Sequence, residues 1–390
     1  MNEPDRTGNL VLGIVFIVIL FAVFLFQIVQ FSLGEIILEK RSLKPRVHFN
    51  IHSPHDFVKD YQNWFNEHFF LRSLLIRTQN RLRFKIFNKS PVPKVILGKD
   101  NWLFQAKQNH PPEHPGYFSS IQPFTFSELE QWRIALEQRQ QWLQKRNIFY
   151  LFIPVPDKSF IYPEFLPDFI KQFYANSRLE QLVNHLQRYS DIYVLDFIDL
   201  FRLHKRDYLL YHKTDSHWND FGAYLAYCRI ITFLASRFSM QVNIAPLDIS
   251  DFMIKRPIMR GGNLARMLAF QDRRFWERRV KLKPVIPGTW KKVPIPSELD
   301  VSRTLRPLII ERPLPALPRT VMFHDSSGMA LRPFLSNHFS HILFLRDWSF
   351  RFWVKVIEQE KPKILIDVIA EHFLYRRKLS NPQKLIDTPE

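Results

Sequence analysis

The chain has 390 residues, of which 46% are hydrophobic, so it is long and apolar enough for one large domain with an insertion or for two domains. Lysine and arginine total 55 against 37 aspartates and glutamates, which gives a formal net charge of +18. This excess favours an anionic partner, which could be nucleic acid, anionic lipid or an acidic polysaccharide. Because Cys228 is the single cysteine, an intramolecular disulfide and a multi-cysteine metal site are excluded.

The N-terminal region carries an apolar run at residues 10–26 that continues, past one glutamine, to Phe31. Its length is just sufficient to cross a hydrocarbon core of about 30 Å. No Ala-x-Ala-like cleavage site follows, so we expect a short tail at 1–9 and a retained signal anchor at 10–31. The basic residues that follow the run would by themselves favour a cytoplasmic body, although large domains can override this bias.

The next segments are predicted to be helical and then extended. Residues 57–87 show helical spacing with many basic residues, within a membrane-proximal helical linker expected at 32–92. Residues 95–104 are typical of a β hairpin. Thr125 and Glu128 form a capping box that opens a helix at 127–146.

Strand and helix patterns then alternate, which predicts a doubly wound α/β sheet in a domain spanning 93–375, followed by a tail at 376–390. The expected strands lie at 148–153, 192–195, 320–323, 342–345 and 364–369, and the expected helices include 178–189 and 220–237. In such folds, functional sites gather at the carboxyl ends of the strands.

Residues 240–318 break this pattern because proline recurs throughout, and we expect a basic insertion without long elements. Within it, residues 273–279 interleave basic and aromatic side chains. Such a run forms either a solvated or membrane-facing surface or a groove for an anionic polymer. In the second case Arg273, Arg274 and Trp276 would contact the polymer through guanidinium forks and ring stacking.

A polar run at residues 211–222 holds the strongest signal for chemistry. Asp215 and His217 lie two residues apart, so on an extended backbone their side chains point to the same side and can hydrogen-bond. Ser326 follows the expected strand at 320–323 on a tight turn, beside backbone N–H groups that could stabilise an oxyanion. Together they would form a triad in which serine attacks an acyl carbon, histidine takes its proton and aspartate orients the imidazole. Ser327 competes with Ser326 as the nucleophile.

The same run permits a second interpretation. His212, Asp215 and His217 could supply three ligands to zinc. Because no cysteine or further ligand cluster stands out, the triad is favoured, and neither a metal nor a cofactor is expected. We expect His324 and His372 to be structural.

Several segments in order resemble the AlgX/AlgJ-type alginate O-acetyltransferase family, whose catalytic part is an SGNH hydrolase-like domain. The resemblance runs from about residue 57 to 375. The matching segments are Phe69–Arg72, Gly98–Phe104, Pro154–Lys158, Ile161–Pro167, Thr214–Asn219, Gly222, Gly262–Leu268 and Asp325–Ser326.

This resemblance implies a circularly permuted SGNH arrangement on an α/β/α domain, with Ser326 as nucleophile, His217 as general base and Asp215 as its orienting acid. Neighbouring residues are expected to contact substrate, namely Trp218, Asn219, Asp325 and Ser327. The chain departs from the family pattern where His324 replaces a glycine.

The resemblance also implies a function. It predicts acetyl transfer to hydroxyls of an extracytoplasmic polysaccharide, with a membrane-bound O-acyltransferase relaying the acetyl group. The body would then lie on the extracytoplasmic side of the inner or plasma membrane, and nucleic acid is not an expected partner. An acetylesterase with the same triad and a non-catalytic polysaccharide-binding or assembly protein stay open as alternatives.

Overall fold

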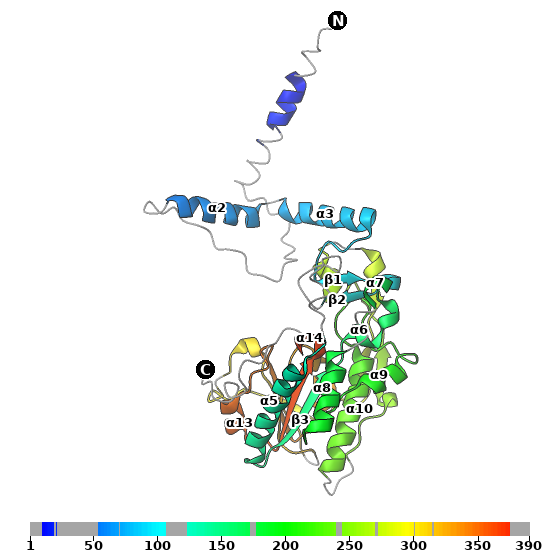
Figure 1. Cartoon of the computed structure of the whole chain (residues 1–390), viewed down its shortest axis with the longest axis vertical. Helices are drawn as coiled ribbons and strands as arrows, with labels where there is room; N and C mark the ends of the chain where they lie inside the picture. The colour runs from blue at the N-terminus through cyan, green and yellow to red at the C-terminus, as the bar shows by residue number, and fades with distance from the viewer. Residues whose placement is uncertain are drawn as a thin grey trace. The chain divides into compact units, whose positions relative to one another are not determined.

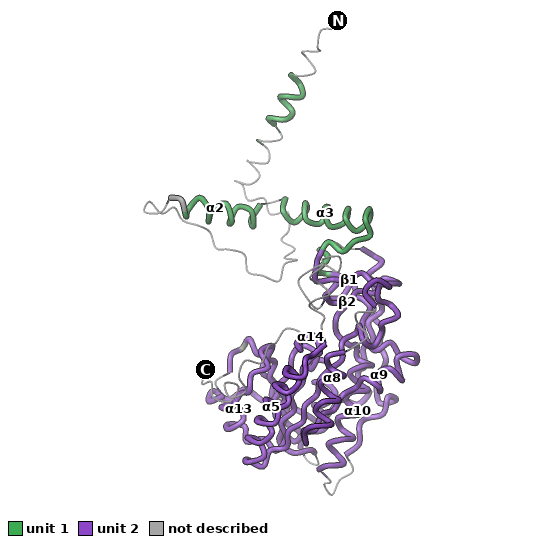
Figure 2. Tube along the Cα trace, viewed as in Figure 1, with its two compact units in different colours: residues 1–91, 266–270 green, residues 92–265, 271–390 purple. Residues whose placement is uncertain are grey.

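The computed structural model describes residues 10–18, 21, 54–69, 71–106, 123–171, 177–238, 244–269, 272–299, 301–313 and 316–374. They belong to two compact units, which Figure 2 distinguishes by colour. The first unit comprises residues 1–91 and 266–270, and the second comprises 92–265 and 271–390.

The first unit is helical where it is described, with a helix at residues 10–18, α2 (Pro54–His68) and α3 (Arg72–Phe87). The helical segment expected at 57–87 is therefore two helices. No helix among the described residues combines the length and apolar character needed to cross a bilayer. Of the anchor expected at 10–31, residues 19–20 and 22–31 lie outside the described part, as do both expected tails and the start of the linker.

The second unit is organised around a six-stranded sheet with the order β3-β12-β10-β11-β9-β8. In that order the strands are Phe149–Val155, Ile364–Ala370, Thr320–His324, His341–Arg346, Leu308–Glu311 and Lys291–Val293. The first four are parallel to one another, and β9 pairs antiparallel with both β11 and β8. The mixed α/β fold is confirmed, but the segment at 240–318 is more than an insertion, because it supplies β8 and β9 to the main sheet.

Both faces of the sheet are covered, since alternate side chains of its strands belong to two separate hydrophobic cores. Leu151 and Ile366 share one core with α10 (Asp220–Arg237) and α12 (Arg332–Leu335). The second core contains residues from α5 (Phe126–Gln144), α8 (Arg178–Tyr189) and α13 (Val354–Glu360). Figure 1 shows α5 and α8 side by side in this layer. The unit is thus a three-layer α/β/α sandwich.

The long helices start where side chains cap them. Thr125 forms the predicted capping box with Glu128 at the start of α5. Ser177 accepts the N–H of Glu180 at the start of α8. Asn219 caps α10 by accepting two backbone N–H groups. Each such cap contributes about 1 kcal/mol and fixes the first turn, so these helices begin close to their predicted positions.

The remaining elements are short. The predicted hairpin is confirmed as β1 (Val95–Leu97) and β2 (Leu103–Gln105). Two further antiparallel pairs are present. They are β4 (Phe252–Lys255) with β7 (Lys281–Pro284), and β5 (Ile258–Met259) with β6 (Glu277–Arg278). The strand expected at 192–195 is only an isolated bridge from Val194 to Phe152. The short helices are η1 (Lys99–Asn101), α6 (Lys158–Ile161), η2 (Pro163–Phe165), α7 (Asp168–Lys171), α9 (Ile198–His204), η4 (Ile249–Asp251), α11 (Asn263–Met267), η5 (Arg273–Phe275), η6 (Arg303–Leu305), η7 (Ser327–Ala330) and α14 (Glu371–Leu374).

Candidate active site

The candidate site lies at the carboxyl ends of the parallel strands β3, β10 and β12. Hydrogen bonds between the residues that follow these strands tie them together. The N–H of Ala370 donates to Asp325 Oδ2 at 2.6 Å, and the N–H of Asp157 donates to Glu371 Oε2 at 3.0 Å. Functional sites in α/β folds gather at this end of the sheet. Here, buried carboxylates link the segments that follow the strands.

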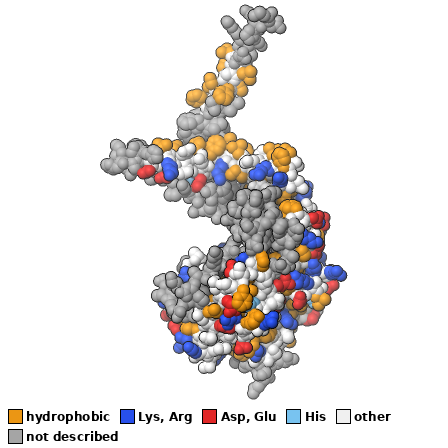
Figure 3. Space-filling view, in the orientation of Figure 1, with side chains coloured by type: hydrophobic (Ala, Val, Ile, Leu, Met, Phe, Trp, Pro, Cys, Tyr) orange, Lys and Arg blue, Asp and Glu red, His pale blue; other side chains and the backbone are white. Residues whose placement is uncertain are grey.

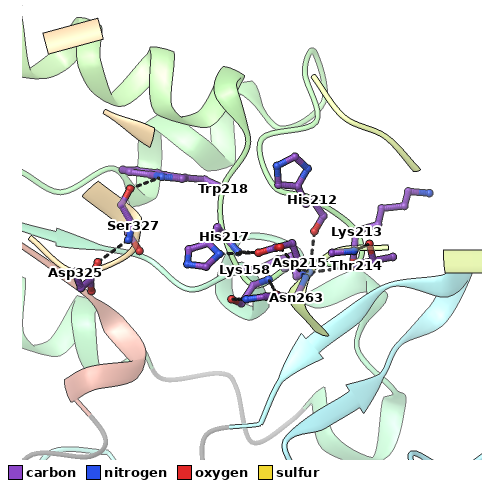
Figure 4. A network of polar contacts seen from close by, with 12 residues as sticks. Lys158, His212, Lys213, Thr214, Asp215, His217, Trp218, Asn263, Asp325 and Ser327 are labelled. Atoms are coloured by element: carbon purple, nitrogen blue, oxygen red, sulfur yellow. Dashed lines mark hydrogen bonds and ion pairs between the residues drawn. The ribbon is translucent and has the colours of Figure 1, made fainter. Parts of the chain in front are cut away.

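Asp215 and His217 form a hydrogen-bonded pair on the loop between α9 and α10 (Figure 4). His217 Nδ1 donates to Asp215 Oδ1 at 2.6 Å, and the His217 backbone N–H donates to the same oxygen at 3.1 Å. The N–H of Asn263 donates to Asp215 Oδ2 at 2.8 Å. Both carboxylate oxygens are thus occupied, and the imidazole is held in one orientation.

The electrostatics of the pair suit a general base. Burial alone would raise the pKa of Asp215, but hydrogen bonds from His217 and Asn263 outweigh it and hold that pKa well below its usual range. The carboxylate stays ionised and selects the His217 tautomer with the proton on Nδ1. His217 Nε2 has no hydrogen-bond partner among the described residues, and the side chain is 31% exposed. It can therefore accept a proton from a hydroxyl.

Lys158, which follows β3, holds the backbone of this loop. Its Nζ donates to the carbonyl oxygens of His212 at 2.9 Å, Lys213 at 3.0 Å and Asp215 at 2.7 Å (Figure 4). The three N–H groups of an ammonium are all used. Burial lowers the pKa of Lys158 to about 7, against the opposing effect of the Glu277 and Asp215 carboxylates.

Glu277 on β6 holds the same loop through its other backbone groups. Its carboxylate accepts the N–H of Lys213 at 2.7 Å, the N–H of Thr214 at 3.1 Å and the Thr214 hydroxyl at 2.5 Å. Sequence patterns did not predict a role for Lys158 or Glu277. Lys158 lay in a segment of the family resemblance, whereas nothing local marks Glu277, 63 residues beyond Thr214.

Gly262 packs so closely against this loop that a side chain there should disturb it. A Cβ at position 262 would lie 2.5 Å from Asp215 Cβ and 2.6 Å from the Thr214 carbonyl oxygen. We expect Gly262→Ala to lower the free energy of unfolding by about 1–3 kcal/mol and also to lower turnover. Denaturant melts and initial rates would measure both. Gly288→Ala, which meets the side chains of Asn337 and Trp290 instead, is the control and should leave turnover intact when the protein is folded.

The turn that carries the predicted nucleophile, Ser326, follows β10. Ser326 has φ −66° and ψ −24°, is half-buried, and makes no hydrogen bond through its hydroxyl to any described residue. Beneath it, Asp325 Oδ1 accepts the N–H of Ser327 at 2.7 Å. That N–H is therefore not available to stabilise an oxyanion. Of the backbone N–H groups expected to do so, those of Ser326 and its other neighbours are left. The helix expected after the turn is broken into η7 and α12.

His324 is structural, as predicted. Its Nδ1 donates to the Asp325 carbonyl oxygen at 2.5 Å, and its Nε2 accepts from Arg332 Nε at 3.0 Å and Nη2 at 2.9 Å. Burial lowers the pKa of His324 to about 3, and the positive charge of Arg332 adds to this effect. The imidazole is neutral, with a glycine, Gly328, packed against it.

Trp218 connects the two halves of the predicted triad. Its Nε1 donates to the carbonyl oxygen of Ser327 at 2.9 Å. Because Trp218 follows His217 and Ser327 follows Ser326, this buried bond brings the two segments together. In Figure 4 the imidazole of His217 points from Asp215 toward the turn that carries Asp325 and Ser327.

Comparison with known proteins agrees with this architecture. Residues 95–284 match the family model described as the SGNH hydrolase-like domain of the acetyltransferase AlgX, a match that includes Asp215 and His217 and ends before Ser326. A stretch of 171 residues, 44% of this chain, is 25% identical to the probable alginate O-acetylase AlgJ of Pseudomonas syringae pv. tomato. Both matches support an AlgX/AlgJ-type family, and the family model covers just under half of the chain. The aligned stretch covers 40% of the AlgJ relative's length.

Two solved structures share the fold of this chain. PatB1 of Bacillus cereus has a TM-score of 0.53 and 17% identity, over 72% of this chain and 96% of its own. A DHHW family protein from Eubacterium siraeum has a TM-score of 0.50 and 13% identity, over 75% of this chain and 98% of its own. At these identities the likeness concerns the fold.

The residues beside Asp215, His217 and Ser326 make internal bonds. Trp218, Asn219, Asp325 and Ser327 are all buried. Asn219 Oδ1 accepts the N–H groups of Phe221 at 2.9 Å and Gly222 at 3.2 Å, and the other three make the internal bonds described above. These internal bonds hold the site together, and substrate contact at the four positions stays a prediction.

The basic and aromatic run behaves differently, because part of it is at the surface. Trp276 is 36% exposed, and the guanidinium carbons of Arg260 and Arg273 lie 5.4 Å and 5.7 Å from its ring centroid. Arg274 forms an ion pair with Asp272 at 2.8 Å. Trp276 directly precedes Glu277, which holds the loop of Asp215.

The zinc interpretation is not supported by the geometry. Among the described residues, no group of three or more histidine, cysteine, aspartate or glutamate side chains could hold a metal ion. Figure 4 shows the ring of His212 directed away from Asp215, and burial lowers the pKa of His212 to about 4. His372 pairs with Asp157, with Nδ1 and Oδ1 3.3 Å apart.

Proposed function

We propose that this protein is an O-acetyltransferase that transfers acetyl groups to hydroxyls of an extracytoplasmic, alginate-like polysaccharide through an acetyl-serine at Ser326. The observation that carries the proposal is the 2.6 Å bond between His217 and Asp215, held beside the Ser326 turn by the bond from Trp218 to Ser327. The names of the family model and of the AlgJ relative support acetyl transfer and an alginate-like acceptor.

The first half of the reaction loads the enzyme. Ser326 Oγ attacks the acetyl carbonyl carbon of the donor while His217 Nε2 takes the hydroxyl proton, and ionised Asp215 stabilises the imidazolium. The N–H of Ser326 is one donor for the tetrahedral oxyanion, a type of contact worth on the order of 3 kcal/mol. The donor's acyl–oxygen or acyl–sulfur bond then breaks, and His217 returns the proton to the leaving group.

The second half regenerates Ser326. A sugar hydroxyl gives its proton to His217 Nε2 and attacks the acetyl-serine carbonyl, and collapse of the intermediate leaves an acetyl ester on the sugar. The proton returns to Ser326 Oγ, so the step is balanced without a cofactor. Water in place of the sugar would give acetylesterase activity at the same residues.

The basic side chains support an anionic sugar chain as the acetyl acceptor, and the family resemblance suggests the source of the acetyl group. Arg273, Arg274 and Trp276, with Arg260, offer guanidinium and ring faces to an anionic sugar chain. A membrane-bound O-acyltransferase would supply the acetyl group. The body would lie outside the cytoplasm on the inner or plasma membrane, anchored by residues 10–31.

Peptide mapping after reaction with a chromogenic acetyl ester tests the proposal. We expect a burst of released chromophore and one acetyl group on the peptide that contains Ser326. Adding an oligosaccharide acceptor should move the acetyl group to sugar, whereas release as acetate alone would identify an esterase. The absence of any acyl-enzyme, with the protein folded and saturated with ester, would overturn both enzymatic readings in favour of a polysaccharide-binding protein.

A further inference from the structure

Helix α3 (Arg72–Phe87) has a one-sided charge composition. It contains five basic residues and no acidic residue. The basic positions are Arg72, Arg77, Arg81, Arg83 and Lys85. A helix that is only cationic is attracted to surfaces of uniform negative charge.

The same helix exposes an aliphatic stripe. Leu75, Leu82 and Ile86 are 55%, 52% and 66% exposed. At about 100° per residue these three positions fall within about 40° of one another around the helix axis. Arg83 and Lys85, both exposed, lie about 80° to either side of the stripe. Apolar side chains are therefore bordered by cations on both flanks.

The opposite side of α3 carries a buried side chain and a hydrogen bond within the first unit. Phe84 is buried, and Asn80 Nδ2 donates to the carbonyl oxygen of Leu268 at 2.9 Å. These two positions point roughly 160–200° away from Leu82. The aliphatic stripe thus faces away from the contacts that the helix makes within the first unit. Figure 3 shows hydrophobic and basic side chains next to each other along this unit.

We propose that α3 lies in the plane of an anionic lipid surface, with Leu75, Leu82 and Ile86 at the boundary between headgroups and acyl chains. Arg83 and Lys85 would extend along the apolar region so that their charged ends reach lipid phosphates. Two observations favour lipid as the occupant: the helix carries only positive charge, and the apolar run at residues 10–26 precedes it in the same chain. This inference is independent of the catalytic proposal.

A fluorescent label on the full chain tests the orientation. In a Cys228→Ser background, Leu82→Cys and Ser73→Cys would each carry an NBD group, and the protein would be reconstituted into phosphatidylcholine vesicles with or without phosphatidylglycerol. Ser73 is an exposed position on the same helix, about 180° from Leu82. With phosphatidylglycerol present, we expect a blue shift and quenching by brominated acyl chains at position 82 and neither at 73.

Neutralising the basic side chains of α3 shows whether binding to anionic lipid causes the blue shift at position 82. The triple change Arg81→Gln, Arg83→Gln and Lys85→Gln should remove most of the blue shift at position 82, because each basic residue near an anionic surface strengthens binding by about fivefold. Equal signals at positions 82 and 73 in anionic vesicles would overturn the proposal. A blue shift at 82 that is equally large in vesicles of phosphatidylcholine alone would also overturn it, because anionic lipid would then not be what binds the stripe.

Discussion

Ser326→Ala is expected to lower the rate of acetyl transfer by about ten-thousandfold or more, because it removes the only atom that would carry the acetyl group between donor and sugar. Losses of this order follow removal of a nucleophile whose base and orienting acid act as one unit with it. The folded structure should persist, since the Ser326 hydroxyl bonds to no described residue. Initial rates with a chromogenic acetyl ester and an oligosaccharide acceptor would measure the loss.

The neighbouring serine provides a matched control. Ser327→Ala keeps the backbone N–H that donates to Asp325 and the carbonyl oxygen that accepts from Trp218. We therefore expect it to retain most of the activity and the acyl-enzyme. If Ser327→Ala were inactive and Ser326→Ala active, the nucleophile would be the second serine. If both were active, the triad mechanism would fail.

Lys158→Met should lower both stability and turnover. It leaves the carbonyl oxygens of His212 and Asp215 without the donor that they share, whereas the Lys213 carbonyl keeps the N–H of Leu103 at 2.9 Å. Each unpaired buried group costs about 1–3 kcal/mol, so a loss of about 2 kcal/mol or more in unfolding free energy is expected. The carbonyl of Asp215 is one of the two. A shift of about 1 Å in its carboxylate would lower kcat by about a hundredfold. Denaturant melts and steady-state kinetics would measure both effects.

Lys205→Met is the control for Lys158→Met. Lys205 also donates to a backbone carbonyl, that of Ile161 at 2.7 Å, and to Glu164 at 3.0 Å, but its ammonium holds no carbonyl of residues 212–217. It should cost some stability and leave kcat unchanged. A Lys158→Met protein with normal kcat, measured where it is folded, would show that Lys158 stabilises the fold without positioning the triad.

Local signals account for the parts of the fold that the sequence predicts well. Helices α8 and α10 begin after Ser177 and Asn219, whose side chains cap them, so both ranges agree with the prediction. The strands β10, β11 and β12 are short apolar runs buried on both faces, which is a pattern that the sequence shows directly. Asp215 and His217 also interact locally, two residues apart.

Distant contacts account for most of what was missed. Glu277 meets Thr214 across 63 residues, and no spacing rule links them. The strands β8 and β9 occur in a segment rich in proline, where strand signals are weak. They are recognised as part of the main sheet only because β9 pairs with β11 and β8 pairs with β9. The internal partners of buried Asn219 and Asp325 were also not predicted, because those partners are set by the packing around the two residues.

The outermost strand of the sheet, β8, leaves one row of backbone hydrogen-bonding groups without a neighbouring strand in the described sheet. Two of its three residues are exposed lysines, Lys291 and Lys292. When two molecules approach edge to edge, these ammonium groups would repel each other before the backbones could pair. The charge on this strand therefore disfavours edge-to-edge pairing of sheets from two molecules, which would lead to aggregation. Such pairing becomes more frequent as the protein concentration rises.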